Sequence, residues 1–334
     1  MPTYKLTLAY DGTDFAGWQK QEPPDPAAAL PGEPTPAPIT TRKLEPGLVA
    51  GTPGRVALRT VQAVVERAVR EVVREPVMLQ GASRTDAGVH ARAQVAVFAC
   101  GEGTQASKRQ GAQGAEAVEG RATGGWPVGR GVDRLLRAVN SRLPEDVQVV
   151  RAEVVREGFD PIGDCIAKGY SYSFWAGMHR PLWERRYVWH TWAALDVGAM
   201  QHAAAAFVGV HDFAAFAAAG HGRMSTVREV YACEVREEGK GEGATERRSD
   251  EGPSISGSHA EAEPGRMIRL EISGNGFLYN MVRIIAGTLH EVGRGRIDGG
   301  AIAEIIASGE RRRAGPTLPP QGLCLEWIRY REGR

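Results

Sequence analysis

Asp86 is the residue best suited to chemistry in this chain of 334 residues, because its surroundings predict a loop that displays side chains. It lies in a run of small and polar residues at 83–91, and Gly81 and Gly88 on either side permit positive φ. Apolar residues then alternate with a period of two at 94–98, as expected for a strand. The pattern therefore predicts a tight loop between strands, with a carboxylate on it.

Arg84 stands two residues before this acid. An acid and an arginine displayed together on a loop suit a catalytic site or an anion-binding site. A structural alternative is that Arg84 and Asp86 pair with each other or cap a turn. The local chemistry is compatible with both interpretations.

Three low-complexity stretches interrupt the patterned sequence, at about residues 21–55, 101–129 and 237–265. The first is rich in proline, the second in Gly, Ala, Gln, Glu and Thr, and the third in Glu, Gly and Ser. Their low apolar content predicts mobile loops inserted between core elements, either as solvated padding or as extra grip on a partner.

Without these inserts, the remaining elements form two halves of the same order, β-α-β-β-α-β, which is the ferredoxin-like unit. The first half predicts strand 3–10, helix 59–74, strands 77–82 and 93–99, helix 131–141 and strand 146–154. The second predicts strand 168–175, helix 196–207, strands 227–236 and 267–274, helices 277–292 and 298–308, and strand 323–330. The fold class is therefore α+β, with an N-terminal subdomain at 1–165 and a C-terminal subdomain at 166–334.

Composition limits the possible function classes. The apolar fraction of 42% supports a sizeable core, and no apolar run approaches the roughly 20 residues of a membrane span. The four cysteines are scattered without metal-like spacing, which favours reduced thiols in a cytoplasmic protein. The net charge is +1, but residues 237–265 hold eight acidic and three basic residues, a net −5. The rest of the chain therefore carries about +6, which is compatible with a nucleic-acid partner.

The loop motif and six further blocks together resemble the bacterial tRNA pseudouridine synthase A family. Residues 84–91 are similar to the family's catalytic motif, although Ser83 stands where the family has glycine. The other similar blocks, in chain order, lie at residues 10–19, 60–62, 168–172, 209–213, 275–283 and 319–325. The resemblance spans nearly the whole chain and is far more specific than any single block.

This resemblance implies an isomerase that converts uridine to pseudouridine in the anticodon stem-loop of tRNA, at about positions 38–40. It also implies a continuous antiparallel sheet with helices on one face and RNA in a central cleft, and a homodimer. The reaction breaks the bond from C1′ to N1 and rejoins the base through C5, so it requires neither cofactor nor metal. Two alternatives are a eukaryote-like relative with other target uridines and an RNA-binding or RNA-folding module without catalysis.

The resemblance also assigns roles to residues of the pocket. Asp86 becomes the catalytic carboxylate, which either attacks C1′ or removes the C2′ proton. Tyr170 faces the target base, Arg283 is the cation near the carboxylate, and Leu325 walls the pocket. The predicted helix 277–292 places Gly276 and Gly287 on the same face as Arg283, so backbone or substrate can approach this arginine closely.

The remaining roles concern the tRNA. Because a uridine in a stem must be extruded before reaction, Arg84 is expected to fill the vacated position. Residues His211, Asp212 and Phe213 are expected in a loop that contacts tRNA, and His90 either anchors its loop or takes part in catalysis. Phe159 is retained from an RNA-contacting run of the family, but residues 160–163 lack that run's basic and histidine side chains. Contacts with tRNA are then expected to rest more on the basic residues Lys168, Arg180, Arg185 and Arg186.

Overall fold

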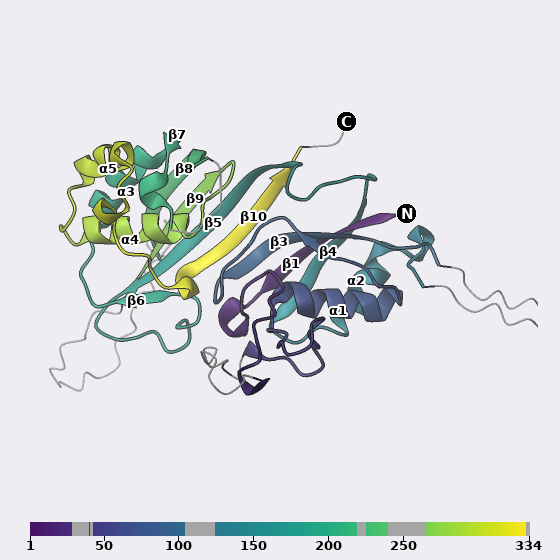
Figure 1. Cartoon of the computed structure of the whole chain (residues 1–334). Helices are drawn as coiled ribbons and strands as arrows, with labels where there is room; N and C mark the ends of the chain where they lie inside the picture. The colour runs from purple at the N-terminus through teal and green to yellow at the C-terminus, as the bar shows by residue number, and fades with distance from the viewer. Residues whose placement is uncertain (29–39, 41–42, 104–123, 219–224, 240–264, 332–334) are drawn as a thin grey trace, which may run out of the picture. The chain divides into compact units, whose positions relative to one another are not determined.

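The computed structural model describes residues 1–28, 40, 43–103, 124–218, 225–239 and 265–331 (Figure 1). By their contacts they divide into two units, Met1–Ile166 with Leu325–Arg334, and Ala167–Cys324. The contacts of the C-terminal strand from Leu325 onward therefore group it with the first unit, whereas the sequence pattern assigned it to the second half. Both units combine strands and helices, so the fold class is α+β, as predicted.

The first unit is a sheet with two helices. Its elements are β1 (Thr3–Tyr10), α1 (Val61–Val73), β2 (Gln80–Gly81), β3 (His90–Ala99), α2 (Val132–Asn140) and β4 (Val147–Val155), joined by residues of β10 (Leu323–Tyr330). Strands run in the order β4-β1-β3-β10, with β2 paired to β3. β1 pairs antiparallel with both β3 and β4, and α2 packs against α1 and β4 (Figure 1).

Alternation on β1 and helical periodicity on α1 build the core of this unit. Leu6 and Leu8 of β1 are fully buried, as are Val64, Val65 and Val69 of α1. The helix begins after Thr60, whose hydroxyl accepts a hydrogen bond from the Ala63 amide at 3.3 Å. Its start is therefore two residues later than the predicted residue 59.

β2 is much shorter than the predicted strand 77–82. The backbone groups of Leu79 are satisfied by side chains of α1 in place of a strand partner. Its amide donates to Glu66 Oε2 at 3.0 Å, and its carbonyl accepts from Gln62 Nε2 at 2.7 Å. Leu79 is thus bonded to α1, shortly before the chain enters the loop at residues 82–89, which we call the catalytic-motif loop.

The second unit contains a four-stranded ladder, one extra strand and three α-helices. Its elements are β5 (Cys165–Ala176), β6 (Trp189–Thr191), α3 (Val197–Ala204), β7 (Gly209–Asp212), β8 (Val227–Glu238), β9 (Arg266–Gly274), α4 (Met281–Gly293) and α5 (Ile302–Ser308). The order β5-β9-β8-β7 is antiparallel throughout, and α3 packs against α4 and β8 (Figure 1).

Three features of this unit differ from the sequence-based expectation. β6 and β7 were not predicted as strands, and β6 pairs parallel with β5, so the sheet is mixed. α4 begins at Met281, four residues later than the predicted start at 277. Asn280 has a φ of 61°, which ends any helical run arriving from Phe277.

The described part of the first insert makes polar contacts that its composition did not predict. Glu45 forms ion pairs with Arg59 and Arg67, and the Gly51 amide donates to Glu22 Oε1 at 3.0 Å. Charged side chains therefore hold this part of the insert. The low apolar content of the insert gave no indication of these contacts. Most of the other two inserts, residues 104–123 and 240–264, lies outside the described residues.

Within the described ranges, no helix is both long and apolar enough to cross a membrane.

Candidate active site

The loop between β2 and β3 carries Arg84 and Asp86 on a closed turn. The amide of Val89 donates to the Asp86 carbonyl at 3.1 Å, and Gly88, the third residue of this turn, has a φ of 82°. A turn with positive φ at that position strongly favours glycine. Asp86 is half-buried and Arg84 is exposed. The predicted loop and the reason for Gly88 are both confirmed.

Gln94 of β3 supports the start of this loop. Its side chain is fully buried, with Nε2 donating to the Ser83 carbonyl at 2.6 Å and Oε1 accepting from the Ser83 amide at 3.2 Å. The same Oε1 accepts from the Val95 amide at 3.1 Å. One amide side chain therefore bonds both the amide and the carbonyl of Ser83. The sequence signal for this contact is a glutamine next to the apolar residues 95–98 of the strand, but it does not identify the partner.

The segment after β1 holds the other side of the loop. Tyr10 Oη and Thr85 Oγ1 lie 2.7 Å apart in a buried hydrogen bond, and the Trp18 amide donates to the Thr85 carbonyl at 3.0 Å. Gly17 has a φ of 100°, and a Cβ there would lie 2.9 Å from the same carbonyl oxygen. Thr85, adjacent to Asp86, is thus fixed through both its side chain and its backbone.

Gly12 makes the closest approach to the loop. A Cβ at this position would lie 2.0 Å from the Val89 carbonyl oxygen. Only glycine fits there without movement of the backbone. The glycines of the block at residues 10–19 are therefore explained by direct backbone contact with the catalytic-motif loop.

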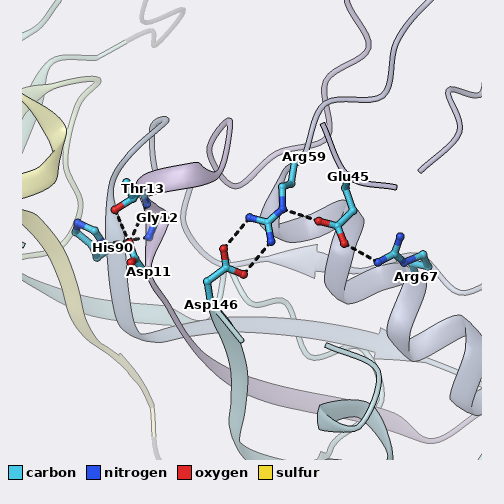
Figure 2. Close-up of polar contacts among 8 residues, drawn as sticks. All are labelled: Asp11, Gly12, Thr13, Glu45, Arg59, Arg67, His90 and Asp146. Atoms are coloured by element: carbon cyan, nitrogen blue, oxygen red, sulfur yellow. Dashed lines mark hydrogen bonds and ion pairs between the residues drawn. The ribbon is translucent and has the colours of Figure 1, made fainter. Parts of the chain in front are cut away.

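His90 anchors the end of the loop, as one of its two predicted roles required (Figure 2). The ring is buried, with Nδ1 3.0 Å from the Gly12 amide nitrogen and 3.2 Å from Asp11 Oδ1. Nδ1 accepts from Gly12 when it is unprotonated and donates to Asp11 when it carries a proton. Burial would raise the pKa of the Asp11 carboxyl, but hydrogen bonds from His90 and Thr13 hold it well below its usual range.

A charged network of Arg59, Asp146, Glu45 and Arg67 lies next to the residues that follow β1 (Figure 2). The guanidinium of Arg59 donates to both carboxylate oxygens of Asp146 at 2.7 and 2.9 Å, and to Glu45 at 2.5 Å. It also lies 4.1 Å above the ring of Phe15. Burial would lower the pKa of Arg59, but the two carboxylates raise it above its usual range, so it remains charged. The network joins the residues after β1 to β4 and to the first insert.

In the second unit, two tyrosines of β5 have different environments. Tyr172 is fully buried, and its hydroxyl donates to the Pro319 carbonyl at 2.8 Å. Burial raises its pKa well above the usual value. Tyr170 is 8% exposed, and its ring meets Phe277 edge to face at 5.2 Å between centroids. Of the two tyrosines, Tyr172 is therefore the more deeply buried, and its hydroxyl is used in a contact within this unit.

Arg283 is positioned by the first turn of α4 and the segment before β10. Its Nε donates to the Leu318 carbonyl at 2.6 Å, and Nη1 donates to Asn280 Oδ1 at 2.7 Å. A Cβ on Gly287 would lie 1.8 Å from the Pro316 carbonyl oxygen. Backbone therefore approaches this helix face closely, as the glycine spacing predicted. Gly276, by contrast, precedes the helix.

The other predicted site residues lie in varied settings. Phe159 is half-buried and packs on Tyr330 at 5.0 Å between ring centroids, and Leu325 is fully buried. Lys168 is half-buried on β5. Near β7, the exposed Asp212 accepts from the Ala214 amide at 3.0 Å, a turn-forming contact.

Two of the residues near β7 are held by local contacts. His211 Nε2 lies 2.9 Å from the Val208 carbonyl oxygen. Phe213 is fully buried between His211 and Phe216, so its ring supports this segment by packing.

The two units divide the predicted site between them. The first carries Arg84, Asp86, Phe159 and Leu325, and the second carries the tyrosine, the arginine and the other predicted RNA contacts. Across the described ranges, no group of three or more His, Cys, Asp or Glu residues is arranged to hold a metal ion.

Comparison with known proteins identifies relatives that cover nearly the whole chain. A family model described as tRNA pseudouridine synthase matches residues 203–331. A tRNA pseudouridine synthase A of Solidesulfovibrio magneticus is 37% identical, with 99% of this chain and 92% of the relative covered. A tRNA pseudouridine synthase A 2 of Clostridium perfringens is 33% identical over 99% of this chain and all of its own length. One from Myxococcus xanthus is 34% identical over the whole chain and 94% of the relative.

Proposed function

Because the chain belongs to the tRNA pseudouridine synthase A family, we propose that Asp86 is the carboxylate with which it isomerises uridine in tRNA. The protein is an isomerase that forms pseudouridine in tRNA. The reaction breaks the C1′–N1 bond, turns the uracil and forms a C1′–C5 bond. C5 then loses its proton to water, and N1, freed from the sugar, takes up one proton. Atoms and electrons balance within the nucleotide, so a positioned carboxylate and a pocket that holds the detached base suffice.

The observation that carries this proposal is that hydrogen bonds hold the loop around Asp86 at several positions. Carboxylate chemistry at a sugar carbon requires the reacting atoms to be held within a fraction of an ångström, and misplacement by about 1 Å costs about a hundredfold in rate. The loop is held at Ser83 by Gln94, at Thr85 by Tyr10 and Trp18, and at Val89 by its own turn. An ordinary surface turn needs no support from three directions.

The remaining parts of the mechanism extend this proposal. Asp86 attacks C1′ or takes the C2′ proton, Tyr170 packs against the base, Arg283 supplies positive charge near the carboxylate, and Leu325 walls the pocket. Arg84, which is exposed on the same loop, fills the place of the extruded uridine. The target uridines lie in the anticodon stem-loop, at about positions 38–40.

The architecture around this chemistry is proposed on the same basis. The order β4-β1-β3, with β2 beside β3, supports a ferredoxin-like first half. By family analogy, the second half follows the same plan, the two sheets join beside an RNA cleft, and two copies form a homodimer. Tyr172 and Phe159 then support the site by packing. All four cysteines are free thiols, which suits a cytoplasmic enzyme.

The test uses tRNA labelled with tritium at C5 of uridine, because pseudouridine formation releases that label to water. Asp86→Asn keeps the shape of the side chain but removes its charge, so we expect no measurable release and nearly unchanged tRNA binding. The control Asp133→Asn makes the same exchange at an exposed position in the first turn of α2 and should retain full activity. Easily measured turnover by Asp86→Asn would remove this residue from the mechanism. Wild-type assays on tRNAs that lack single uridines would identify the target positions.

A further inference from the structure

An exposed set of aromatic and arginine side chains lies on the loop between β5 and β6 and just after β6. We call it the aromatic–arginine surface, and it consists of Met178, Arg180, Leu182, Trp183, Arg185 and Trp192. Trp183 is 88% exposed and Trp192 is 64% exposed. Tryptophan is among the most buried residue types on average, so two such exposed indoles within ten residues call for a partner.

Hydrogen bonds and packing anchor both ends of the loop between β5 and β6. Gly177 N donates to the Thr191 carbonyl at 3.1 Å, which closes the loop where β5 and β6 meet. The Trp175 indole donates to the His179 carbonyl at 3.0 Å, and Val188 is buried at the other end. The indoles are thus presented by an anchored loop and do not belong to a fraying end of the chain.

The arginines are arranged to favour flat, anionic ligands. The guanidinium carbon of Arg180 lies 5.1 Å from the centre of a Trp192 ring, and His190 meets the same indole edge-on at 4.5 Å. Arg185 is exposed, and its Nη1 donates to the Leu182 carbonyl at 2.5 Å; a guanidinium has four further N–H donors. Residues 178–187 contain three arginines and a single acid, Glu184, in a protein whose net charge is only +1.

From these features we propose that the aromatic–arginine surface binds unpaired nucleotides of the tRNA, with bases stacked on Trp183 and Trp192 and phosphates held by Arg180 and Arg185. Single-stranded RNA is recognised by this combination of aromatic platforms and guanidinium groups. The base faces of a paired A-form stem are already stacked on each other, so indoles gain nothing there. The inference rests on the proposed tRNA substrate and adds a second contact to it.

A second copy of this chain is the competing occupant, and charge argues against it. A two-fold interface brings the same patch of each subunit together, so the arginines of both subunits would lie in one interface. Like charges across an interface oppose association, whereas a polyanion neutralises them. RNA therefore satisfies both the apolar and the charged members of the surface.

The experiment measures the dissociation constant for an unmodified full-length tRNA transcript. Trp183→Ala and Trp192→Ala should each weaken binding by about fivefold to a hundredfold, the range for one lost base stack. Trp183→Phe keeps an aromatic face and should bind nearly as wild type, whereas Trp183→Leu keeps apolar bulk alone and should bind like the alanine variant. If the leucine variant binds as well as wild type, stacking is not the interaction and the proposal fails.

The arginines provide an independent readout. Arg180→Ala and Arg185→Ala should each lower the slope of log Kd against log salt by about 0.7, the value for one phosphate of a single strand. Arg134→Ala, an exposed arginine on α2, is the matched control and should leave the slope unchanged. Unchanged slopes for the two loop variants would contradict phosphate binding.

Two RNA sources of unpaired nucleotides can be separated with the same variants. If the penalty of Trp183→Ala persists on an isolated anticodon stem-loop, the anticodon loop is the ligand. If it disappears on tRNA without its unpaired 3′ nucleotides, that end is the ligand. Either result supports the proposal, whereas equal binding of variant and wild type to every RNA overturns it. Loss of a dimer on light scattering, with RNA binding unchanged, would assign the surface to a second copy. Tritium release by the wild type establishes the underlying tRNA activity separately.

Discussion

Gly12→Ala should slow catalysis without touching the substrate. The new Cβ would start 2.0 Å from the Val89 carbonyl oxygen, and real Cβ atoms are essentially never found within 3.0 Å of such a neighbour. The Val89 backbone must therefore retreat by about 1 Å or more. Because the Val89 amide is bonded to the Asp86 carbonyl, this displacement passes directly into the turn that carries the carboxylate.

The expected loss follows from that distance. A shift of about 1 Å in a reacting group lowers kcat by about a hundredfold. Forcing a methyl group into a filled space also costs about 1–3 kcal/mol of the free energy of unfolding. The tRNA itself does not need to touch Gly12, so KM should change much less than kcat.

The assay compares tritium release at saturating tRNA for the wild type and the variant, at a temperature where circular dichroism shows both to be folded. Gly129→Ala is the matched control, since a Cβ there meets nothing within 4 Å and the backbone needs no positive φ. It should leave both kcat and the melting temperature unchanged. A folded Gly12→Ala enzyme with wild-type kcat would refute the idea that this backbone contact positions Asp86.

Three further predictions test other parts of the structure. Glu66→Gln should lower the free energy of unfolding by about 1–3 kcal/mol in denaturant titrations, because it weakens the hydrogen bond that the buried carboxylate accepts from the Leu79 amide. The ion-pair partners of Glu66 can return to water. An unchanged denaturation midpoint would contradict this prediction. His290 is a buried residue of α4, and burial lowers its pKa below the unfolded value of about 6.5. Its contribution to stability is therefore complete above that pH and is lost as pH falls below it. The melting temperature of the wild type should therefore fall more steeply between pH 7 and 5 than that of His290→Asn, and parallel curves would refute the assignment. Arg84→Ala should lose most of its activity on tRNA whose target uridine is paired, because extrusion from a paired stem costs a few kcal/mol. On tRNA mismatched at the target, the activity of the variant relative to wild type should recover. Equal losses on both RNAs would show that Arg84 does not fill the place of the extruded uridine.

Local patterns predicted the elements of this fold where a single periodicity governed them. Alternation placed β1 at residues 3–10, as observed, and helical spacing placed α1 to within two residues. The predictions failed where long-range partners replaced the local pattern. Residues 77–79 look like a strand, yet Leu79 is bonded to side chains of α1. The three-residue β6 exists because β5 lies beside it, which no local pattern reveals.

The candidate site shows the same distinction. The turn at Gly88 and the close approach at Gly287 could be predicted, because positive φ and close approach restrict the residue type. Gln94 and Tyr10 were not assigned roles, because their partners, Ser83 and Thr85, lie elsewhere in the chain. A polar residue on a buried strand signals such a partner but does not identify it.

The charged attachment of the first insert has a thermodynamic consequence. Residues 43–55 are held by Glu45 and by contacts to Arg67, while Leu44 and Val49 remain exposed. Release of this segment from the rest of the protein would expose little apolar surface. It would therefore add little to the heat-capacity change of unfolding or to the denaturant dependence of the free energy of unfolding. Salt, in contrast, weakens ion pairs directly. Amide exchange in this segment should therefore accelerate with ionic strength well before the core opens, as a separate, low-energy opening of the native protein.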